Sequence, residues 1–416
     1  MKNNLYNWIW KWHFIGGLIS LPVILLLAIT GTVYLFKDDY EKPIKEKLMT
    51  VKAVGEPLSY QQQWEIAKQN WDRMPNAMEM PTSKTETTEF VSGMFSHKSS
   101  LYIDPYSGNV NGKIQLDQTD MHKVRKLHGE LLMGTFGTKI VELAASWMLV
   151  LIITGLYIFW PRGRGWKGFF TICTKGNKRI VYRDLHAITG FWFSLMLLLI
   201  LAGGLPWTDV FGSGFQWVQN QTNTGYPTSW QGRTFSSEVN GQALTLDDMV
   251  RTAQNLNLKG NVSISLPKNK NAVYTISNQT SDLNRLAVYH FDQYSGKLLY
   301  HGSWEDIGVL MKTRLWVMAL HQGEFGFWNW LLVLVTALAL IVMSITAIIS
   351  YIKRKKKGEW SIPEVPSGFS LDAGIIIMVI ILGILLPLFG LSLTVIYLIE
   401  KRKVILGQKN TVQTAE

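Results

Sequence analysis

The chain contains little cysteine and lacks the short motifs that bind nucleotides. Cys173 is the single cysteine in 416 residues, which excludes an internal disulfide, a cysteine-based zinc site and an iron–sulfur cluster. There is no glycine-rich phosphate-binding motif, and no dinucleotide-binding fingerprint follows a strand. If the protein carries out redox chemistry, its electrons must come from a separate donor.

The positive charge is confined to short tracts. The formal net charge is +11, from 41 Lys and Arg against 30 Asp and Glu. A basic balance of this size is compatible with nucleic-acid binding. Here, however, the basic residues flank apolar runs that are far longer than a soluble core helix needs. This arrangement favours membrane topology, and we expect no nucleic-acid partner.

Four apolar runs are long enough to cross the roughly 30 Å of a bilayer's hydrocarbon layer. They cover residues 14–36, 140–160, 187–207 and 328–352. The first is too long for the core of a signal peptide, and no small-residue cleavage site follows it. We therefore expect a multi-pass protein embedded in a lipid bilayer.

Basic residues mark one side of the membrane. The loop 161–185 and the tract 353–357 belong in the cytoplasm by the positive-inside rule. The N-terminus, with Lys2 and Lys11, then lies on the same side, and the long polar segments 37–127 and 208–320 lie outside. The basic residues of the loop are Arg162, Arg164, Lys167, Lys175, Lys178, Arg179 and Arg183.

A final apolar stretch, residues 373–399, is interrupted by Pro387. A single crossing would put the charged residues 400–403 outside, against the positive-inside rule. A break near Pro387 to Gly390 would keep both ends inside, but each arm of about 13 residues is too short for a full span. We expect a partly inserted hairpin or a kinked helix.

The chain is internally duplicated. The sequence HFIGGLISLPVILLLAITG at the first span matches HAITGFWFSLMLLLILAGG at the third. The segment that begins LHGELLMG before the second span matches the segment that begins LHQGEFG before the fourth, and both end in basic residues. Between the spans, LYIDPYSGNV parallels YHFDQYSGKLLY. Alternating apolar residues around a Ser-Gly turn are typical of a β-hairpin.

Each half therefore consists of a span, an outer α+β module and a second span. A duplicated two-span unit packs naturally as a four-helix bundle with approximate two-fold symmetry. The predicted fold is a helical membrane protein with a four-helix transmembrane bundle, two extracytoplasmic α+β modules and an extra C-terminal apolar segment. Along the chain we expect an N-terminal segment with the first span (1–36), the first module with the His128 segment (37–139), the second span (140–160), a basic cytoplasmic loop (161–185), the third span (186–207), the second module with the His321 segment (208–327), the fourth span (328–352), a cytoplasmic linker (353–370), the apolar hairpin or kinked helix (371–400) and a cytoplasmic tail (401–416).

Four histidines lie at the ends of the four spans. His13 and His186 occupy equivalent positions at the cytoplasmic ends, and His128 and His321 occupy equivalent positions outside. An ionisable residue at the edge of a span is costly unless it has a partner or a function. Imidazole pairs on facing helices of a bundle can hold a haem iron. The hydrocarbon layer separates His13 from His128, so we pair His13 with His186 and His128 with His321.

Small and basic residues accompany these histidines. Gly17 and Gly190 follow His13 and His186 by four residues, so each glycine lies on the same helical face as its histidine. A missing side chain there lets a flat macrocycle approach the backbone. Basic residues near the four histidines are available to pair with haem propionates. They are Lys11, Arg183, Arg125 with Lys126, and Arg314, which precedes His321 by about two helical turns.

Two alternatives stand beside haem ligation. Aromatic residues and histidines are frequent at membrane edges, so the four histidines would then be interfacial residues, like the anchoring tryptophans Trp8, Trp10, Trp12, Trp328 and Trp330. A zinc or copper site would need a third or fourth ligand, and no other His, Cys or carboxylate recurs at these positions. The arrangement in two symmetric pairs favours haem.

Other polar residues offer weaker signals. Glu142, near the outer end of the second span, and Glu324, after His321, would either orient a ligand imidazole by accepting its second N–H or be solvated. No Ser-His-Asp or paired-carboxylate arrangement follows from the spacing. His122 precedes His128 by six residues and would be able to approach the outer site along a helix. The histidines without a repeat-matched partner, for which we expect exposed or locally hydrogen-bonded side chains, are His97, His122, His290 and His301.

The repeated units with LHGELLMG and ALHQGEFG resemble the PepSY-associated transmembrane proteins, and the DPYSG and DQYSG hairpins resemble the PepSY modules between their spans. The resemblance covers almost the whole chain, including the closing LLPLFGLSL segment. The family includes bacterial inner-membrane ferric-siderophore reductases that bind two b-type haems. The resemblance implies that the four motif histidines ligate two b-type haems, and that the chain lies in the bacterial cytoplasmic membrane with its N-terminus inside. Some relatives carry fused flavoprotein domains, which this chain lacks.

Two functions are compatible with the sequence. In the first, a cytoplasmic reductase or a quinol supplies electrons to the His13 and His186 site. The electrons leave from the His128 and His321 site to a ferric siderophore or another ferric chelate outside, and the reduced iron is released because ferrous iron binds hard oxygen ligands more weakly. In the second, the chain is a membrane-anchored PepSY regulator or sensor without redox activity, and its histidines are structural.

Overall fold

The structure is a computed structural model of the chain, and it describes residues 2–93, 97–160, 165–174, 177–365 and 369–399. The described residues form two compact units. The helical unit contains the residues up to 32, residues 126–215 and the residues from 331 onward. The sheet unit contains residues 33–125 and 216–330.

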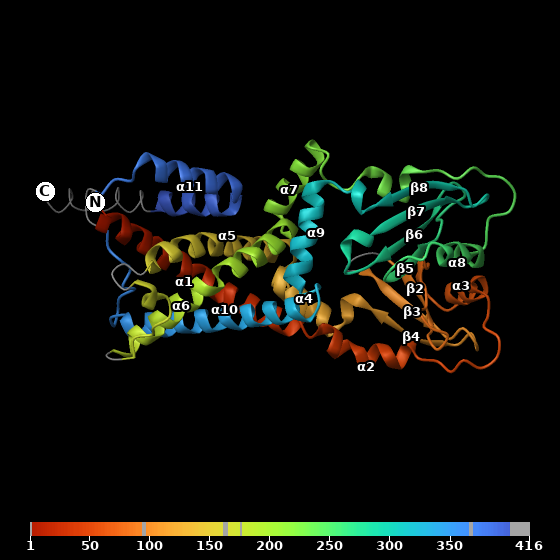
Figure 1. Cartoon of the computed structure of the whole chain (residues 1–416), viewed down its shortest axis with the longest axis horizontal. Helices are drawn as coiled ribbons and strands as arrows, with labels where there is room; N and C mark the ends of the chain where they lie inside the picture. Colours follow the sequence, from red (N-terminus) through yellow and green to blue (C-terminus); the bar gives the residue numbers. More distant parts are fainter. Residues whose placement is uncertain (1, 94–96, 161–164, 175–176, 366–368, 400–416) are drawn as a thin grey trace, which may run out of the picture. The chain divides into compact units, whose positions relative to one another are not determined.

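Four helices of the described chain are long and apolar enough to cross a membrane. They are α1 (Lys2–Tyr34), α5 (Gly134–Phe159), α6 (Lys178–Gly204) and α10 (Phe327–Arg354). Figure 1 shows these four helices running along one another. The chain is a multi-pass membrane protein, as the four predicted spans indicated. Its other long helices are α2 (Lys37–Met49), α4 (Asp120–Glu130), α7 (Val210–Gln221) and α9 (Val309–Gln322).

The membrane helices extend beyond the apolar runs that predicted them. α1 begins at Lys2, and α6 begins at Lys178, where the side chain of Asn177 caps its N-terminus. Hydrophobicity marks only the part of a helix inside the bilayer, whereas the helical backbone continues until a residue breaks or caps it. His13 and His186 therefore lie about three and two turns inside their helices.

Aromatic contacts pack α1 against its neighbours. Trp147 of α5 is fully buried, and a Cβ at Gly16 of α1 would clash with its indole ring. Trp12 stacks on the same indole with a centroid separation of 6.4 Å. At the basic end of α10, the Arg354 guanidinium lies 4.6 Å from the ring centroid of Phe14. Helix α1 thus contacts both α5 and α10.

The basic loop between α5 and α6 is held by a buried carboxylate. Asp184, which is 7% exposed, accepts a hydrogen bond from the backbone N–H of Cys173 and forms an ion pair with Arg183. Part of the predicted basic side lies outside the described residues, namely Arg162, Arg164, Lys175 and residues 400–416.

The final apolar stretch forms two short helices, α11 (Ala373–Leu385) and a second one over Pro387–Ile399. The backbone of Gly383 and that of Gly390 are in close contact, because a Cβ added at Gly383 would lie 3.3 Å from the Cα of Gly390. In a continuous helix these two residues would be roughly 10 Å apart. Of the two predicted alternatives, the hairpin is therefore observed.

The sheet unit contains eight antiparallel strands in the order β4-β3-β2-β1-β5-β6-β7-β8. Each half of the repeat contributes one helix followed by four strands, in which sequential strands pair. The first half provides α3 (Tyr60–Gln69), β1 (Ala77–Glu79), β2 (Thr88–Ser92), β3 (Ser99–Ile103) and β4 (Val110–Gln115). The second half provides α8 (Leu246–Asn255), β5 (Asn261–Ser265), β6 (Val273–Gln279), β7 (Ala287–Asp292) and β8 (Leu298–Ser303).

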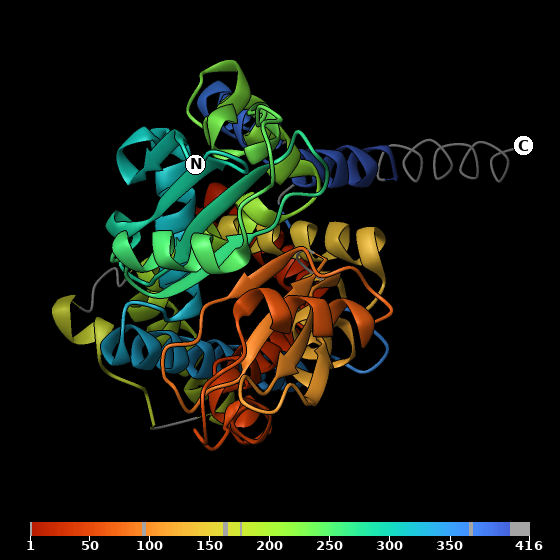
Figure 2. The same cartoon turned by 90° about the vertical axis from the view of Figure 1, so that its right-hand side faces the viewer.

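The two predicted modules share one sheet, which the sequence had not indicated. Strands β1 and β5 pair antiparallel, with Met78 opposite Ile264. This pairing satisfies backbone groups that each module alone would leave open at an edge. The helices cap each other as well: the Asp247 carboxylate of α8 accepts from the backbone N–H of Tyr60 in α3, while the backbone N–H of Leu246 donates to a Gln61 side chain. Figure 2 shows α3 and α8 side by side.

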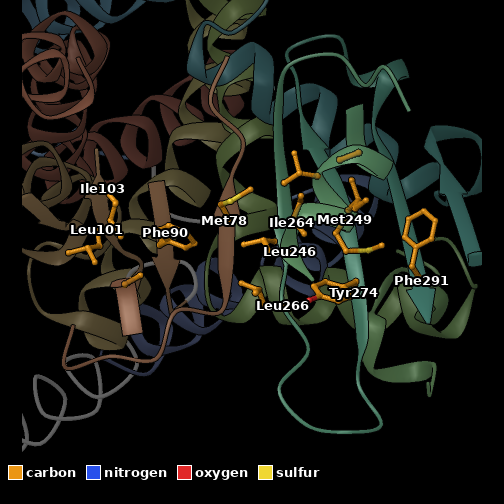
Figure 3. Packing of buried hydrophobic residues seen from close by; sticks show 14 of the residues in the cluster. Met78, Phe90, Leu101, Ile103, Leu246, Met249, Ile264, Leu266, Tyr274 and Phe291 are labelled. Carbon is orange, nitrogen blue, oxygen red and sulfur yellow. The ribbon is translucent and has the colours of Figure 1, made fainter. Parts of the chain in front are cut away.

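A single core cluster crosses the boundary between the modules (Figure 3). Met78 and Phe90 from the first half, and Ile264 and Ile276 from the second, are all 0% exposed. They pack with α3 and α8 over one face of the sheet. The joined sheet therefore doubles the core that either half would bury alone.

The two predicted β-hairpins are confirmed, joining β3 to β4 and β7 to β8. Asp104 and Asp292 each accept hydrogen bonds from the backbone two residues on and from a serine hydroxyl three residues on. Gly108 and Gly296 close the turns with φ of 74° and 68°, which favours glycine. The sequence repeat is therefore also a repeat of turn geometry.

Candidate functional site

His13 and His186 are brought together within the helical unit, as predicted. Their ring centroids are 6.5 Å apart, and the rings meet at 77°. The two side chains come from α1 and α6, which the duplication makes equivalent. Two imidazoles in this edge-to-face arrangement do not stack on each other.

The main chain fixes the tautomer of His186. Its Nδ1 lies 2.9 Å from the backbone oxygen of Met343 on α10. A carbonyl oxygen only accepts, so Nδ1 must carry the proton and donate it. The Nε2 atom of His186 therefore keeps its lone pair, with which it can coordinate a metal ion.

A threonine fixes the tautomer of His13 in the same sense. Its Nδ1 lies 2.9 Å from Oγ1 of Thr154 on α5. The Thr154 hydroxyl donates its single proton to the carbonyl of Val150 at 2.7 Å, so towards His13 it acts as an acceptor. Nε2 of His13 is thus also left with a free lone pair, and the two histidines offer the same nitrogen.

A glycine next to this threonine makes room for the ring. A Cβ added at Gly155 would lie 3.2 Å from Cε1 of His13, tighter than an ordinary contact. The pair Thr154 and Gly155 therefore provides both a hydrogen-bond acceptor and the space for the imidazole.

His128, in the last turn of α4, is held in the same way. Its Nδ1 lies 3.0 Å from Oγ1 of Thr30 on α1, and the Thr30 hydroxyl donates to the carbonyl of Leu26 at 2.7 Å. A Cβ added at Gly31 would lie 3.2 Å from Cε1 of His128. The ring nitrogen of His128 that faces a threonine is thus the same one, Nδ1, as in His13.

These Thr-Gly pairs were missed in the sequence, although a signal was present. Ile-Thr-Gly occurs at residues 29–31, 153–155 and 188–190, in each case inside a membrane helix, and the first two of these face a histidine. Threonine in a membrane helix can bond its own backbone, and glycine permits close packing. The sequence alone did not show which histidine each pair faces.

His321 belongs to the sheet unit, where it lies in the last turn of α9. Gly323 ends this helix in the left-handed conformation, with φ of 76°. Asn329, which is 0% exposed, donates from Nδ2 to the carbonyl of Leu320 and accepts from the backbone N–H of Phe325. Asn329 thus fixes the main chain on both sides of His321. The pairing of His321 with His128 stays a prediction.

The predicted neighbours of the histidines have varied surroundings. A Cβ at Gly17 would meet only Leu151 at 4.0 Å, whereas a Cβ at Gly190 would lie 3.1 Å from the methyl group of Met343. Arg183 donates to the Asp184 carboxylate from Nε and from its terminal nitrogen. Arg125 lies exposed on α4 in the sheet unit. The proposed contacts of these residues with a macrocycle or its propionates stay predictions.

Glu142 has a structural role, which corrects both alternatives that the sequence suggested. The carboxylate is 0% exposed and accepts hydrogen bonds from the backbone N–H groups of Val210 and Phe211, at 2.8 and 2.9 Å. It therefore caps the first turn of α7, where the helix dipole favours a negative charge. Glu324 is exposed, in agreement with the solvated alternative.

The histidines without a repeat partner lie on the sheet unit and in α4. His290 is 0% exposed, with Nδ1 bonded to the Thr275 hydroxyl and Nε2 to the carbonyl of Ser229. His301 is exposed and stacks on Tyr289. His97 is exposed, and His122 is buried at 3% exposure. His290 and His301 match the predicted local environments.

The donor set at His13 and His186 fits a haem better than a bare metal ion. Among the described residues, no group of three or more His, Cys, Asp and Glu is arranged to hold a metal ion. Two nitrogens are too few for a tetrahedral zinc site, but they would suffice for an iron whose other four ligands came from a macrocycle.

Comparison with known families agrees with the fold. The model of the PepSY-associated TM region matches residues 10–354. The match ends before the C-terminal hairpin, so the LLPLFGLSL segment that had seemed part of the resemblance lies outside it. No curated protein matches the chain. The chain belongs to the PepSY-associated transmembrane family.

Proposed function

We propose that this protein is a di-haem transmembrane electron-transfer protein that reduces a ferric chelate, such as a ferric siderophore, outside the cytoplasmic membrane of a bacterium. A b-type haem would be held by His13 and His186, and a second one by His128 and His321. When bound, each haem would supply a one-electron carrier, so that electrons entering on the side of the basic tracts can leave on the opposite side of the membrane.

The observation that carries this proposal is the matched pair of imidazoles. His13 and His186 lie with ring centroids 6.5 Å apart, and each has its Nδ1 proton bonded to an acceptor on a neighbouring helix. Interfacial histidines that merely anchor a helix have no need for a defined tautomer. Metal ligands do, because the second hydrogen bond orients the ring and raises its basicity.

The chain's own residues would do three things at this site. Thr154 and the carbonyl of Met343 hold the two rings in orientation. Gly155 gives the His13 ring its space. The apolar cluster of α1, α5 and α6, with the fully buried Trp147, keeps water from the helices that carry the ligands. One electron passed to a ferric chelate yields ferrous iron, which hard oxygen ligands hold less strongly.

The first test is the visible spectrum of the purified protein from haem-replete cells. We expect a red protein with two haems per chain and a low-spin b-type spectrum on reduction. His13→Ala and His186→Ala should each remove one haem, whereas His301→Ala, at an exposed histidine on the sheet, should keep both. A colourless wild-type protein would overturn the proposal and favour the membrane-anchored regulator.

The second test concerns the substrate. Chemically reduced protein should be reoxidised by a ferric siderophore, with ferrous iron trapped by a colorimetric chelator. The same siderophore loaded with redox-inert gallium is the matched control and should leave the protein reduced. If haem is present but ferric chelates do not reoxidise it, electron transfer would stand and the substrate would have to be sought elsewhere.

A further inference from the structure

The C-terminal hairpin lies outside the family match, and its contacts assign it a defined depth. Leu386, at the break between the arms, and Phe389 are each 3% exposed and belong to the same buried cluster as α1, α5 and α6. Phe389 meets Trp147 edge to face at 4.9 Å, and the Trp147 indole N–H donates to the Ser392 hydroxyl at 3.1 Å. The turn of the hairpin is therefore part of the bundle core.

The contact residue on α5 shows how deep the turn reaches. Trp147 lies at the middle of α5, which runs from Gly134 to Phe159. A helix of this length crosses the bilayer, so its midpoint lies near the bilayer centre. The turn of the hairpin thus lies inside the hydrocarbon layer, beside the part of α1 around Gly16, which also contacts Trp147.

The length of the arms agrees with this depth. α11 has 13 residues, which corresponds to about 20 Å of helix. Half of the hydrocarbon layer is about 15 Å thick. Each arm can therefore connect the midplane to one surface, but it cannot cross. Figure 1 shows α11 beside α5, with its first residues towards the end where α1 begins.

The outward face of the hairpin is strongly apolar. Large side chains on both arms are half or more exposed, and they include Ile377 (57%), Ile384 (72%), Leu391 (59%) and Leu398 (57%). Basic tracts precede and follow the hairpin, at residues 353–357 and 401–403. An apolar face with positive charge at both ends matches one leaflet with its headgroups.

We propose that residues 373–399 form a re-entrant hairpin embedded in the leaflet on the side of the basic tracts. Its outer face binds the acyl chains of that leaflet. Its turn packs against Trp147 and holds the indole ring against Gly16 of α1, a contact that we call the lock. This lock lies one helical turn from His13, so the hairpin positions α1 against α5. The inference does not depend on haem, and it assigns both ends of the hairpin to one side of the membrane.

Sidedness is tested with single cysteines introduced into full-length Cys173→Ser protein in sealed vesicles. Thr414→Cys, after the hairpin, should react with a membrane-impermeant maleimide from the same side as Lys356→Cys, before it. Asn240→Cys, in the segment between the third and fourth spans, should react from the other side. Reaction of Thr414→Cys from the side of Asn240→Cys would show a full crossing and overturn the proposal.

Depth is tested with nitroxide labels on the same background in lipid nanodiscs. Collision with oxygen should be highest for Ile384→Cys and Leu391→Cys near the turn and lower for Ile377→Cys and Leu398→Cys on the arms. Collision with a polar nickel reagent should follow the opposite order. Strong nickel access at Ile384 would mean that the turn is in water and would contradict the proposal.

The lock is tested by Ser392→Ala, with Thr394→Ala as the matched control. Both hydroxyls bond a carbonyl of their own arm, but only Ser392 also accepts from Trp147. Ser392→Ala should lower the thermal midpoint of the protein by a few degrees and increase the rotational freedom of Trp147, whereas Thr394→Ala should leave both unchanged. If the two variants behaved alike, the hydrogen bond between Ser392 and Trp147 would not hold the hairpin in place. The leaflet assignment is tested separately by the labelling experiments.

Discussion

The two halves of the duplication hold equivalent histidines with different groups. His13 donates to the Thr154 hydroxyl and also has a backbone hydrogen bond with Leu151, and His186 donates to the backbone oxygen of Met343, the repeat counterpart of Leu151. Thr346, the counterpart of Thr154 in the repeat, donates to the carbonyl of Val342 just as Thr154 donates to that of Val150. A carbonyl acceptor survives any side-chain substitution, but a hydroxyl acceptor can be lost by one. A backbone hydrogen bond to the histidine is therefore common to both halves, and the first half adds a hydroxyl acceptor.

The same contrast applies to the outer pair. Thr30 and Gly31 hold His128, but the repeat places Gly203 and Gly204 at their equivalent positions. The second half thus offers no hydroxyl there. In the sheet unit, the main chain around His321 is fixed by Asn329. Symmetry of the histidines in the sequence does not require symmetry of the groups around them.

The largest expected effect is loss of a haem, and it tests whether the halves cooperate. His13→Ala and His186→Ala should remove the same haem, because each leaves an iron with one protein ligand. His128→Ala and His321→Ala should remove the other. Haem stoichiometry and reduced spectra of the four variants would check this. If His13→Ala and His128→Ala removed the same haem, the pairing across the two halves would be wrong.

The next largest effect concerns the space that Gly155 leaves for the His13 ring, which tests the first half alone. Gly155→Val would place a branched side chain against Cε1 of His13, where a Cβ alone would already lie at 3.2 Å. We expect loss of most of the haem held by His13 and His186, without loss of the other. Gly374→Val is the matched control, because no atom lies within 4 Å of a Cβ at that position. Quantitative haem analysis measures both, and equal haem loss in the two variants would contradict the role of Gly155.

A smaller effect should distinguish the two acceptors. Thr154→Val removes the hydroxyl that accepts from Nδ1 of His13, with little change in side-chain volume. Loss of such an orienting partner typically weakens metal binding by roughly 10- to 100-fold. The weaker imidazole donor should also raise the midpoint potential of that haem. Thr346→Val should change neither, since the acceptor of His186 is a carbonyl. Redox titration of each variant checks the difference, and identical potentials would argue against a hydroxyl acceptor at His13.

The sequence predicted the features that repeat and missed those that do not. The spans, the β-hairpins and the association of His13 with His186 follow from hydrophobic pattern, turn residues and duplication. The pairing of β1 with β5 was not predictable, because it rests on backbone hydrogen bonds between edges far apart in sequence. The role of Glu142 was missed for a similar reason: its partners are the main-chain N–H groups of Val210 and Phe211, which carry no side-chain signature.

The smallest expected effect is a difference in the free energy of unfolding between variants of the two turn aspartates in the sheet unit. Asp292 is 4% exposed and accepts from Glu238 in addition to its own turn, whereas Asp104 accepts only within its turn. Burial raises the pKa of the Asp292 carboxyl, but hydrogen bonds from the backbone of Ser295, Glu238 and Tyr294 outweigh it and lower the pKa to about 2. A depressed carboxyl pKa stabilises the fold above the unfolded value and loses that contribution as the pH falls through the folded value.

Asp292→Asn should therefore cost about 2 kcal/mol near neutral pH, and Asp104→Asn should cost less. The difference between wild type and Asp292→Asn should shrink as the pH falls from about 4 towards 2, because the wild-type carboxylate is then protonated in both states. Denaturant unfolding of the full chain in detergent, followed by the circular dichroism of the sheet, measures this. If the two variants were equally destabilised at neutral pH, the extra hydrogen bond from the backbone of Glu238 would add nothing, and the halves would be equivalent at their turns.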